Sequence, residues 1–385
     1  MRTAVIGLVL LLVGGIAVIT GVLPPSAVAE LTERVAPILG FVVAITVVTE
    51  LAAEAGLFRW IAEALARFGR GRALVLWLLV VGLATLCTVF LSLDTTAVLL
   101  TPIVVVLARH VGLPPLPFAL TTVWLANTAS LLLPVSNLTN LLAQRQLSGL
   151  DPLGFAALMA APALVAVVVP AAAILIISRR DLLQRYSTPA AEAPADRVLF
   201  GASAVVVALL VPALVSGVEV WIPSAIAAVV LGAFFVVRRP GVLRFGLIPW
   251  QLVVFAAGLF LVVESAHELG LADLLAGVVP AGDDPAALVA LSGTSLVGAN
   301  LLNNLPAYLA IEPIAGDPLR LAAVLIGVNA GPLITPWASL ATLLWHERLT
   351  ALDVKISWAR YAALGVVVAP VTVLAAVGAL ILTRG

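Results

Sequence analysis

The chain has 385 residues, of which 63% are hydrophobic and only 10% are charged. A soluble protein of this length cannot bury so much apolar surface, so the composition excludes a cytosolic protein and favours a membrane protein. Basic and acidic residues balance, so the net charge says nothing about partners. The single cysteine, Cys87, excludes a disulfide within the chain and a multi-cysteine metal site.

Apolar stretches of the roughly 20 residues that a spanning helix needs recur along the whole chain. The first resembles a signal peptide, but its apolar run is long and Leu23-Pro24-Pro25 is a poor cleavage site, so we predict a retained helix. The predicted simple spans lie at 4–23, 36–56, 153–178, 198–216, 220–237, 249–270 and 358–382.

Residues 57–72 differ from these spans because apolar and basic side chains alternate at helical spacing. The pattern predicts an amphipathic helix along the cytoplasmic membrane surface. Its apolar side chains are Leu57, Trp60, Ile61, Leu65 and Phe68.

Four further apolar segments are interrupted by polar residues. We predict re-entrant helical hairpins at 73–111 and 285–313, and broken spanning helices at 117–146 and 319–346. Two full crossings in place of each hairpin remain an alternative, since they leave the parity of the crossings unchanged.

The two halves of the chain repeat each other around these interruptions. At a shift of 202 residues, 127–142 and 329–344 agree at six of sixteen positions, including Asn127/Asn329 and Pro134/Pro336. A second match, at a shift of 214, pairs 48–57 with 262–271. Paired interrupted segments in the two halves of a membrane protein indicate a transport site at their interface.

Positive charge gives the sidedness. With the N-terminus in the cytoplasm, 16 of the 20 Lys and Arg fall on the cytoplasmic side and 4 outside, a strong positive-inside bias. The extra span 198–216 turns the second half upside down. We therefore predict an all-α polytopic protein of the cell (inner or plasma) membrane, with two inverted repeats, each holding a re-entrant hairpin and a broken transmembrane helix. The predicted parts are a first repeat at 1–178, a cytoplasmic linker at 179–197 and a second repeat at 198–385.

Asp94 lies in the middle of the first hairpin, followed by Thr95 and Thr96. A carboxylate at membrane depth costs several kcal/mol unless it is paired or neutralised, so it marks a functional site by default. We predict that Asp94 sits at the tip, that Asp94, Thr95 and Thr96 help to bind the transported solute, and that Asp94 carries a proton. The simpler interpretation is that Asp94 only caps a helix that begins at Thr95.

The first broken span crowds seven polar side chains around Pro134. The proline breaks the helical ladder, and the freed carbonyls must be satisfied by neighbours, water or an ion. The simpler interpretation is a kinked helix whose polar residues hold it to its neighbours. We predict that the segment lines a binding site, with Asn127, Ser136, Asn137 and Asn140 as its candidate residues.

The second half supplies counterparts without a carboxylate. Asn303 and Asn304 precede Pro306 in the second hairpin, and polar residues surround Pro332 and Pro336 in the second broken span. A site built from both halves would therefore hold one titratable group, Asp94. The candidate site residues of the second broken span are Asn329, Thr335, Ser339 and Thr342.

Other polar residues near span ends carry less weight. They suit interfacial anchoring, with a proton path as the alternative: Glu50, Glu54, Glu264, His267 and Glu268. The predicted site contains no Lys or Arg at membrane depth, so it suits a neutral, hydroxyl-rich solute better than a di- or tricarboxylate. An enzyme is not expected, because the three histidines lie near span ends, and neither a cofactor, a bound metal nor a nucleic-acid partner is indicated.

Five stretches carry a resemblance to a known family: LTPIVVVL (100–107), PVSNLTNLLA (134–143), PWQLVVFAAGLFLV (249–262), NNLPAYL (303–309) and GPLITPWASLATLLW (331–345). The chain resembles the ArsB-type arsenite efflux permeases, within the ion transporter superfamily that also holds citrate and dicarboxylate carriers and NhaD-type sodium/proton antiporters. The usual first tip of the family reads Asn-Asp-Gly, where this chain has Leu93-Asp94-Thr95.

The resemblance implies export of arsenite or antimonite hydroxide in exchange for protons, in some members with a separate ATPase subunit. A carboxylate carrier or a sodium/proton antiporter on the same scaffold is the alternative. The residues that fall in the motif positions of the family are Asp94, Asn137, Asn140, Asn303, Asn304, Thr335 and Ser339.

Overall fold

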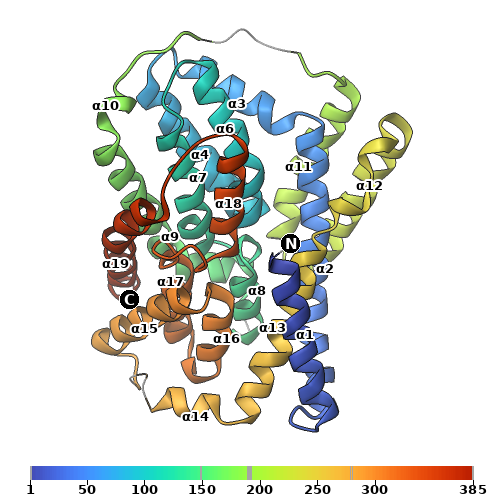
Figure 1. Ribbon diagram of the computed structural model, residues 1–385, viewed down its shortest axis with the longest axis vertical. Coiled ribbons are helices and arrows are strands. Elements are labelled where there is room, and N and C mark those ends of the chain that lie inside the picture. Colours follow the sequence, from blue (N-terminus) through green and yellow to red (C-terminus); the bar gives the residue numbers. More distant parts are fainter. Residues whose placement is uncertain (1, 148–149, 189–192, 278, 280, 384–385) are drawn as a thin grey trace.

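The computed structural model describes residues 2–147, 150–188, 193–277, 279 and 281–383, and no strand occurs in these ranges. Helices form an elongated bundle (Figure 1). Eight helices within the described residues are long and apolar enough to cross a membrane. The predicted polytopic all-α architecture is therefore confirmed.

The helices of the first half follow the predicted order. A simple span, a long helix and a surface helix precede the hairpin, the broken helix and a last span. They are α1 (Arg2–Ile19), α2 (Pro25–Glu54), α3 (Leu57–Phe68), α4 (Ala73–Leu91), α5 (Leu93–Thr95), α6 (Thr101–His110), α7 (Leu116–Thr128), α8 (Leu138–Gln146), α9 (Pro152–Ile177) and α10 (Arg179–Leu182).

The second half begins with one extra helix, α11, and then repeats the order of the first. Its helices are α11 (Arg197–Leu214), α12 (Trp221–Arg238), α13 (Trp250–Glu268), α14 (Leu271–Ala276), α15 (Pro285–Leu301), α16 (Asn304–Ala315), α17 (Pro318–Ala330), α18 (Leu340–Ala351) and α19 (Trp358–Leu382). The hairpin α4/α6 enters the bundle from the end that carries α3, and the hairpin α15/α16 enters from the opposite end (Figure 1). The two repeats are thus inverted, as predicted.

The first helix of each repeat packs against the second helix of the other repeat. α1 packs along α13, and α12 packs along α2. Glycines bring the first pair together: a Cβ on Gly258 would lie 2.5 Å from the amide nitrogen of Leu11, and one on Gly14 would lie 2.4 Å from the Cβ of Leu261. Small residues at a helix crossing allow such close approach of two backbones. This packing ties the halves into one body around the site.

The span boundaries agree with the prediction to within a few residues, except in α2. The predicted span 36–56 begins eleven residues too late, because α2 starts at Pro25. Proline fits the first turn of a helix, where its missing N–H has no intrahelical partner to lose. The charged residues Glu30, Glu33 and Arg34 hid this first part of the helix.

The surface helix α3 covers the residues predicted to be amphipathic, but its buried face differs from the prediction. Leu57, Phe58, Ala62 and Ala66 are buried against the protein. Trp60 and Phe68 are exposed, so only part of the expected apolar face is free to meet a membrane surface.

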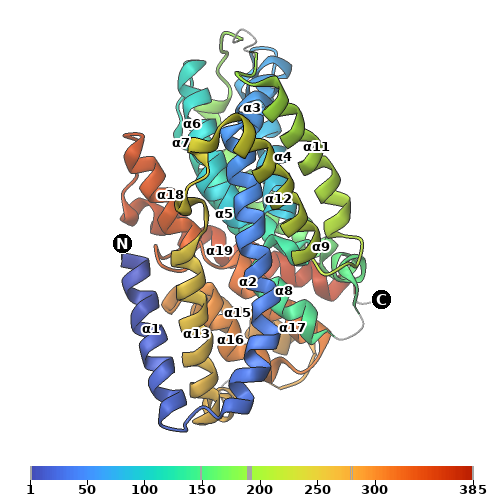
Figure 2. The same cartoon turned by 90° about the vertical axis from the view of Figure 1, so that its right-hand side faces the viewer.

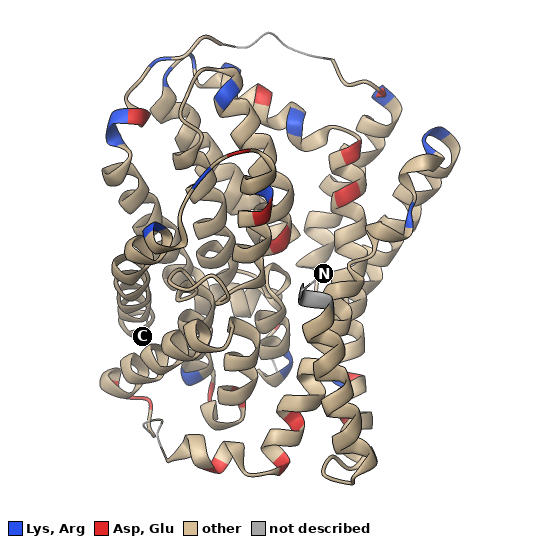
Figure 3. Cartoon of the chain, viewed as in Figure 1, with Lys and Arg blue, Asp and Glu red and all other residues tan. Residues whose placement is uncertain are grey.

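Charge is distributed unevenly over the bundle. Lys and Arg gather at the end that carries α3 and α10, and acidic side chains prevail at the end that carries α14 (Figure 3). α1 starts on one side of the bundle and α19 ends on the other (Figure 2). The cytoplasmic location of the N-terminus stays a prediction.

Candidate functional site

The break between α7 and α8 is stabilised by side chains of its own segment. Two short 3₁₀ turns and an extended residue, Asn137, replace the helix between Ala129 and Leu138. The Asn140 amide donates to the carbonyls of Ser130 at 2.6 Å and Leu133 at 3.0 Å. Carbonyls freed by the break thus find donors inside the protein, as the low-dielectric interior demands.

The break between α17 and α18 is organised by Asn300, from the first leg of the second hairpin. Its Nδ2 donates to the Gly331 carbonyl at 2.9 Å, and its Oδ1 accepts from the amide of Thr335 at 3.1 Å. Thr335 returns a bond from its hydroxyl to the Asn300 carbonyl at 2.7 Å. α19 approaches the same loop so closely that a Cβ on Gly365 would lie 1.9 Å from the Leu333 carbonyl oxygen.

Both hairpin tips turn on a residue with unusual backbone angles. Ser92 has φ 113° and ψ 159°, and Asn303 has φ 152° and ψ 159°. This region is populated almost only by glycine, and side chains that occupy it mark positions where the surrounding fold imposes strain, often at functional sites. Each residue also caps the following helix, since Ser92 Oγ accepts from the Thr95 amide and Asn303 Oδ1 accepts from the Leu305 amide.

The cap at Ser92 corrects the simpler interpretation of Asp94. The helix begins at Leu93, two residues earlier than that interpretation requires, so Asp94 lies in the first turn and caps nothing. Among the described residues, none donates a hydrogen bond to its carboxylate. The Asp94 carboxylate lies at the tip of the hairpin and lines the cavity described next.

A cavity of about 70 Å³ joins both tips and both breaks, and we call it the central cavity. Five of the predicted site residues line it: Asp94, Asn137, Asn303, Asn304 and Ser339. The tips of both hairpins thus meet the breaks of both broken helices at this cavity. Each leg of the first hairpin is long enough to cross a membrane by length alone, but Ser92, Leu93 and Asp94 turn back at this cavity inside the bundle.

Asn329 joins the two halves behind the central cavity. Its Oδ1 accepts from Asn137 Nδ2 at 2.9 Å and from the Thr139 hydroxyl at 2.9 Å. Its Nδ2 donates to Asn140 Oδ1 at 2.7 Å. All these side chains are buried. The Asn329 side chain thus bonds to other protein side chains and does not line the central cavity. Together with Asn140, it holds Asn137 in place.

The remaining predicted residues do not line the central cavity but make hydrogen bonds that position the segments around it. Thr96 accepts from the Thr88 hydroxyl at 2.8 Å, and Ser136 donates to the Val89 carbonyl at 2.9 Å, which fastens the first break to the first hairpin. Asn127 Nδ2 reaches Thr342 Oγ1 at 3.5 Å across the halves. The predicted site residues that do not line the central cavity are Thr95, Thr96, Asn127, Ser136, Asn140, Asn329, Thr335 and Thr342.

One wall of the central cavity, which is largely apolar, was missed in the sequence analysis. It comes from α2 and α13, the two equivalent long helices, through Phe41, Ile45, Thr46, Leu252 and Phe255. The only available signal was the repeat that pairs 48–57 with 262–271, which marks the ends of these helices as equivalent.

A buried ion pair was also missed. Arg34 of α2 bonds to Glu312 of α16, whose side chain is only 3% exposed and also accepts from the Tyr308 hydroxyl at 2.9 Å. Glu312 is thus a second buried carboxylate in the hairpins, while Asp94 is the one carboxylate among the described residues that line the central cavity. The pair couples the second hairpin to α2.

The residues given less weight lie away from the central cavity. Glu54 and Glu268 are exposed, while Glu50 and Glu264 are half-buried. His267 contacts the second hairpin, because its Nε2 lies 3.0 Å from the Leu309 carbonyl. That carbonyl has no helical partner, since Pro313 occupies the position four residues later and has no N–H.

Comparison with known proteins finds membrane transporters as relatives. The family model described as citrate transporter (CitMHS) matches residues 1–342. The arsenical pump membrane protein of Escherichia coli (strain K12) is 32% identical over 381 residues, which cover 91% of this chain and 87% of that protein. Its counterpart in Yersinia enterocolitica is 33% identical over 357 residues, 84% of this chain and 81% of that protein.

Among solved structures, the YdaH transporter of Alcanivorax borkumensis, described as having an unusual topology, aligns with a TM-score of 0.55. The alignment covers 99% of this chain and 96% of that chain at 16% sequence identity, so it supports the fold alone. The chain belongs to the citrate transporter (CitMHS) family and, by its identity over most of its length, to the family of arsenical pump membrane proteins.

Proposed function

We propose that the protein is a secondary active transporter that exports arsenite and antimonite from the cell in exchange for protons. The observation that carries the proposal is the chemistry of the central cavity. One carboxylate, Asp94, faces amides and hydroxyls from both halves, and no Lys or Arg is among the described residues that line it. The names of the relatives, arsenical pump membrane proteins, point to the same class of cargo.

The cargo fits this lining because trivalent arsenic and antimony hydroxides are neutral at pH 7 and present only hydroxyl groups. Each hydroxyl can donate to Asp94 or to an amide oxygen and can accept from an amide N–H. The described residues of the central cavity include no thiol, and Cys87 is buried outside its lining. A thiophilic metalloid is then bound without a covalent trap and can be released.

Exchange follows if cargo and proton compete for Asp94. A deprotonated carboxylate accepts hydrogen bonds from the cargo, and a protonated one no longer offers the same acceptors. Protonation from outside would favour release, and loss of the proton to the cytoplasm would restore the binding form. In this scheme Asp94, Asn137, Asn303, Asn304 and Ser339 contact the cargo.

The same scheme sets the orientation. The end rich in Lys and Arg (Figure 3) faces the cytoplasm by the positive-inside rule. This orientation puts the N-terminus inside and the loop between α11 and α12 outside. The first hairpin then opens toward the cytoplasm and the second toward the outside.

A carrier of citrate or another small carboxylate is the second candidate, favoured by the description of the matching family model. The lining argues against it, because a tricarboxylate would need cationic partners that the described lining does not contain. The two functions are separated by uptake into everted membrane vesicles energised by a proton gradient. We expect uptake of arsenite and none of citrate. Citrate or sodium transport without arsenite transport would assign the protein to the second candidate.

A further inference from the structure

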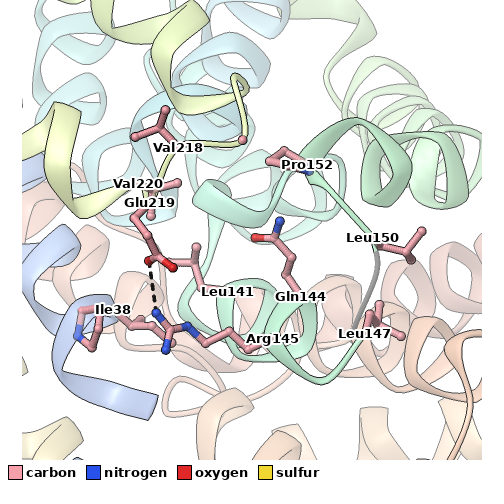
Figure 4. A pocket seen from close by; sticks show the side chains of 12 residues that line it. Ile38, Leu141, Gln144, Arg145, Leu147, Leu150, Pro152, Val218, Glu219 and Val220 are labelled. Atoms are coloured by element: carbon pink, nitrogen blue, oxygen red, sulfur yellow. Dashed lines mark hydrogen bonds and ion pairs between the residues drawn. The ribbon is translucent and has the colours of Figure 1, made fainter. Parts of the chain in front are cut away.

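A second cavity lies next to the central cavity, between the same helices α2 and α8. We call it the outer cavity. Its volume is about 220 Å³. Pro37 and Ile38 of α2 form one wall, and Leu141, Gln144 and Arg145 of α8 form another (Figure 4). The loop between α11 and α12 closes it from a third direction.

The two cavities are separated by a thin apolar partition. Leu141 lines both of them and is 4% exposed. On α2, Phe41 faces the central cavity and Ile38, one turn earlier, faces the outer one. Residues three apart are neighbours on a helix surface, so the cavities follow each other along one seam between α2 and α8.

The mouth of the outer cavity is exposed and polar. Val218 is 50% exposed, and the Glu219 side chain is 60% exposed. Arg145 reaches across the mouth to Glu219 Oε2 at 3.2 Å (Figure 4). Its other terminal nitrogen donates to the Glu33 carbonyl at 3.4 Å. That carbonyl lacks its helical donor because Pro37 stands four residues later.

The position of this mouth fits the outside of the membrane. The loop between α11 and α12 lies on the side of the bundle where α19 ends, opposite the start of α1 (Figure 2). A larger cavity of about 450 Å³ shares Leu147 and Leu150 with the outer cavity, so open space continues around the end of α8.

We propose that the outer cavity is the exit vestibule of the transporter, and that Leu141 is the partition that the cargo passes on its way out. The proposal rests on the proposed transport function. Arg145 and Glu219 at the mouth then offer hydrogen bonds to a small neutral hydroxide after it has left Asp94. The seam widens by a movement of Leu141 or of the short helix α8, whose contacts at the mouth are exposed and therefore weak.

The vestibule is tested by blocking it from outside. The chain has one cysteine, so Cys87→Ala gives a background without thiols. In that background, Gln144→Cys is treated in whole cells with a bulky, membrane-impermeant methanethiosulfonate, and arsenite efflux is measured before and after. We expect efflux at the parent rate before treatment and loss of most of it after treatment. Leu269→Cys is the matched control, since Leu269 is 74% exposed near α14, away from the seam. It should be labelled with no change in efflux.

Two outcomes would decide against the vestibule. Failure of the reagent to label Gln144→Cys from outside, or labelling without loss of efflux, would overturn it. If Gln144→Cys is inactive before treatment, Val218→Cys on the opposite wall takes its place with the same expectation. A parent protein that exports no arsenite would instead overturn the proposed function. The block is then scored on the solute that the parent transports, so the two failures are distinguishable.

The partition is tested by Leu141→Trp beside Leu141→Ala. A tryptophan fills the seam, so the variant should still be stabilised by arsenite in a thermal melt but should export it several-fold more slowly. Leu141→Ala should export at least as fast as the parent. Equal export by Leu141→Trp and the parent would contradict the role of Leu141.

Discussion

Asn137 of the first half and Asn329 of the second are hydrogen-bonded side chain to side chain at 2.9 Å, although 192 residues separate them. Asn329 also bonds to Thr139 and Asn140, so one buried amide holds three polar groups of the other half. This contact fixes the first break, and with it the position of Asn137 in the central cavity.

Asn329→Ala should therefore destabilise the folded protein strongly. It leaves buried partners without a bond, and each such group costs roughly 1–3 kcal/mol. We expect a lower midpoint in a thermal melt of the detergent-purified protein, monitored by tryptophan fluorescence. Thr20→Ala is the control, because its exposed hydroxyl bonds only within its own helix. Equal midpoints for the two variants would show that the Asn329 cluster does not hold the halves together.

The tip at Ser92 predicts an unusual order of two substitutions. Ser92→Ala and Ser92→Gly both remove the cap to Thr95, but only alanine keeps a side chain at φ 113°. Since such a conformation costs on the order of 1–3 kcal/mol for a residue with a side chain, Ser92→Gly should be the more stable variant. The same pair at Thr96, which lies in a helical conformation, should show the opposite order. Thermal melts of all four variants check this.

His267 and Pro313 should be energetically coupled. His267→Ala removes the donor to the Leu309 carbonyl, a loss of about 1 kcal/mol or more. Pro313→Ala restores an N–H four residues after Leu309, which can satisfy the same carbonyl. In a double-mutant cycle, His267→Ala should therefore cost less in the Pro313→Ala background. Purely additive effects would mean that the carbonyl does not need the histidine.

Asp196, at the N-terminus of α11, predicts a pH dependence of stability. Its carboxylate caps α11 and bonds to Arg238 Nε at 2.9 Å, and this bond together with the cap amides lowers its pKa below the usual value. A lowered pKa in the folded state means that the stabilisation is complete above the unfolded-state pKa of about 3.9 and is lost as the pH falls through the folded value. Asp196→Asn keeps a cap acceptor but no charge. It should melt below the wild type at pH 7, and the difference should vanish under strongly acidic conditions. A difference that persists there would contradict the ionic origin.

Much of this architecture was predictable because it depends on residue types and on the spacing of apolar residues along the chain. Long apolar runs gave the spans, and prolines among amides gave the breaks. The matched Asn127 and Asn329 revealed the repeat. Contacts across the halves were not predictable, since nothing local relates Asn137 to Asn329 or Arg34 to Glu312. The cap at Ser92 rather than Asp94 depends on a turn two residues earlier, and Phe41 and Phe255 come from apolar helices without any local signal.

The central claim, that cargo and proton share Asp94, is tested most directly by proton release. Arsenite is added to the detergent-purified protein in weakly buffered solution near the pH at which transport is half-maximal, and the pH change is recorded. The account predicts that the wild-type protein releases protons as arsenite binds and that Asp94→Asn, checked for a single dispersed species, releases none. Arsenite binding without proton release, or the same release from Asp94→Asn, would contradict it.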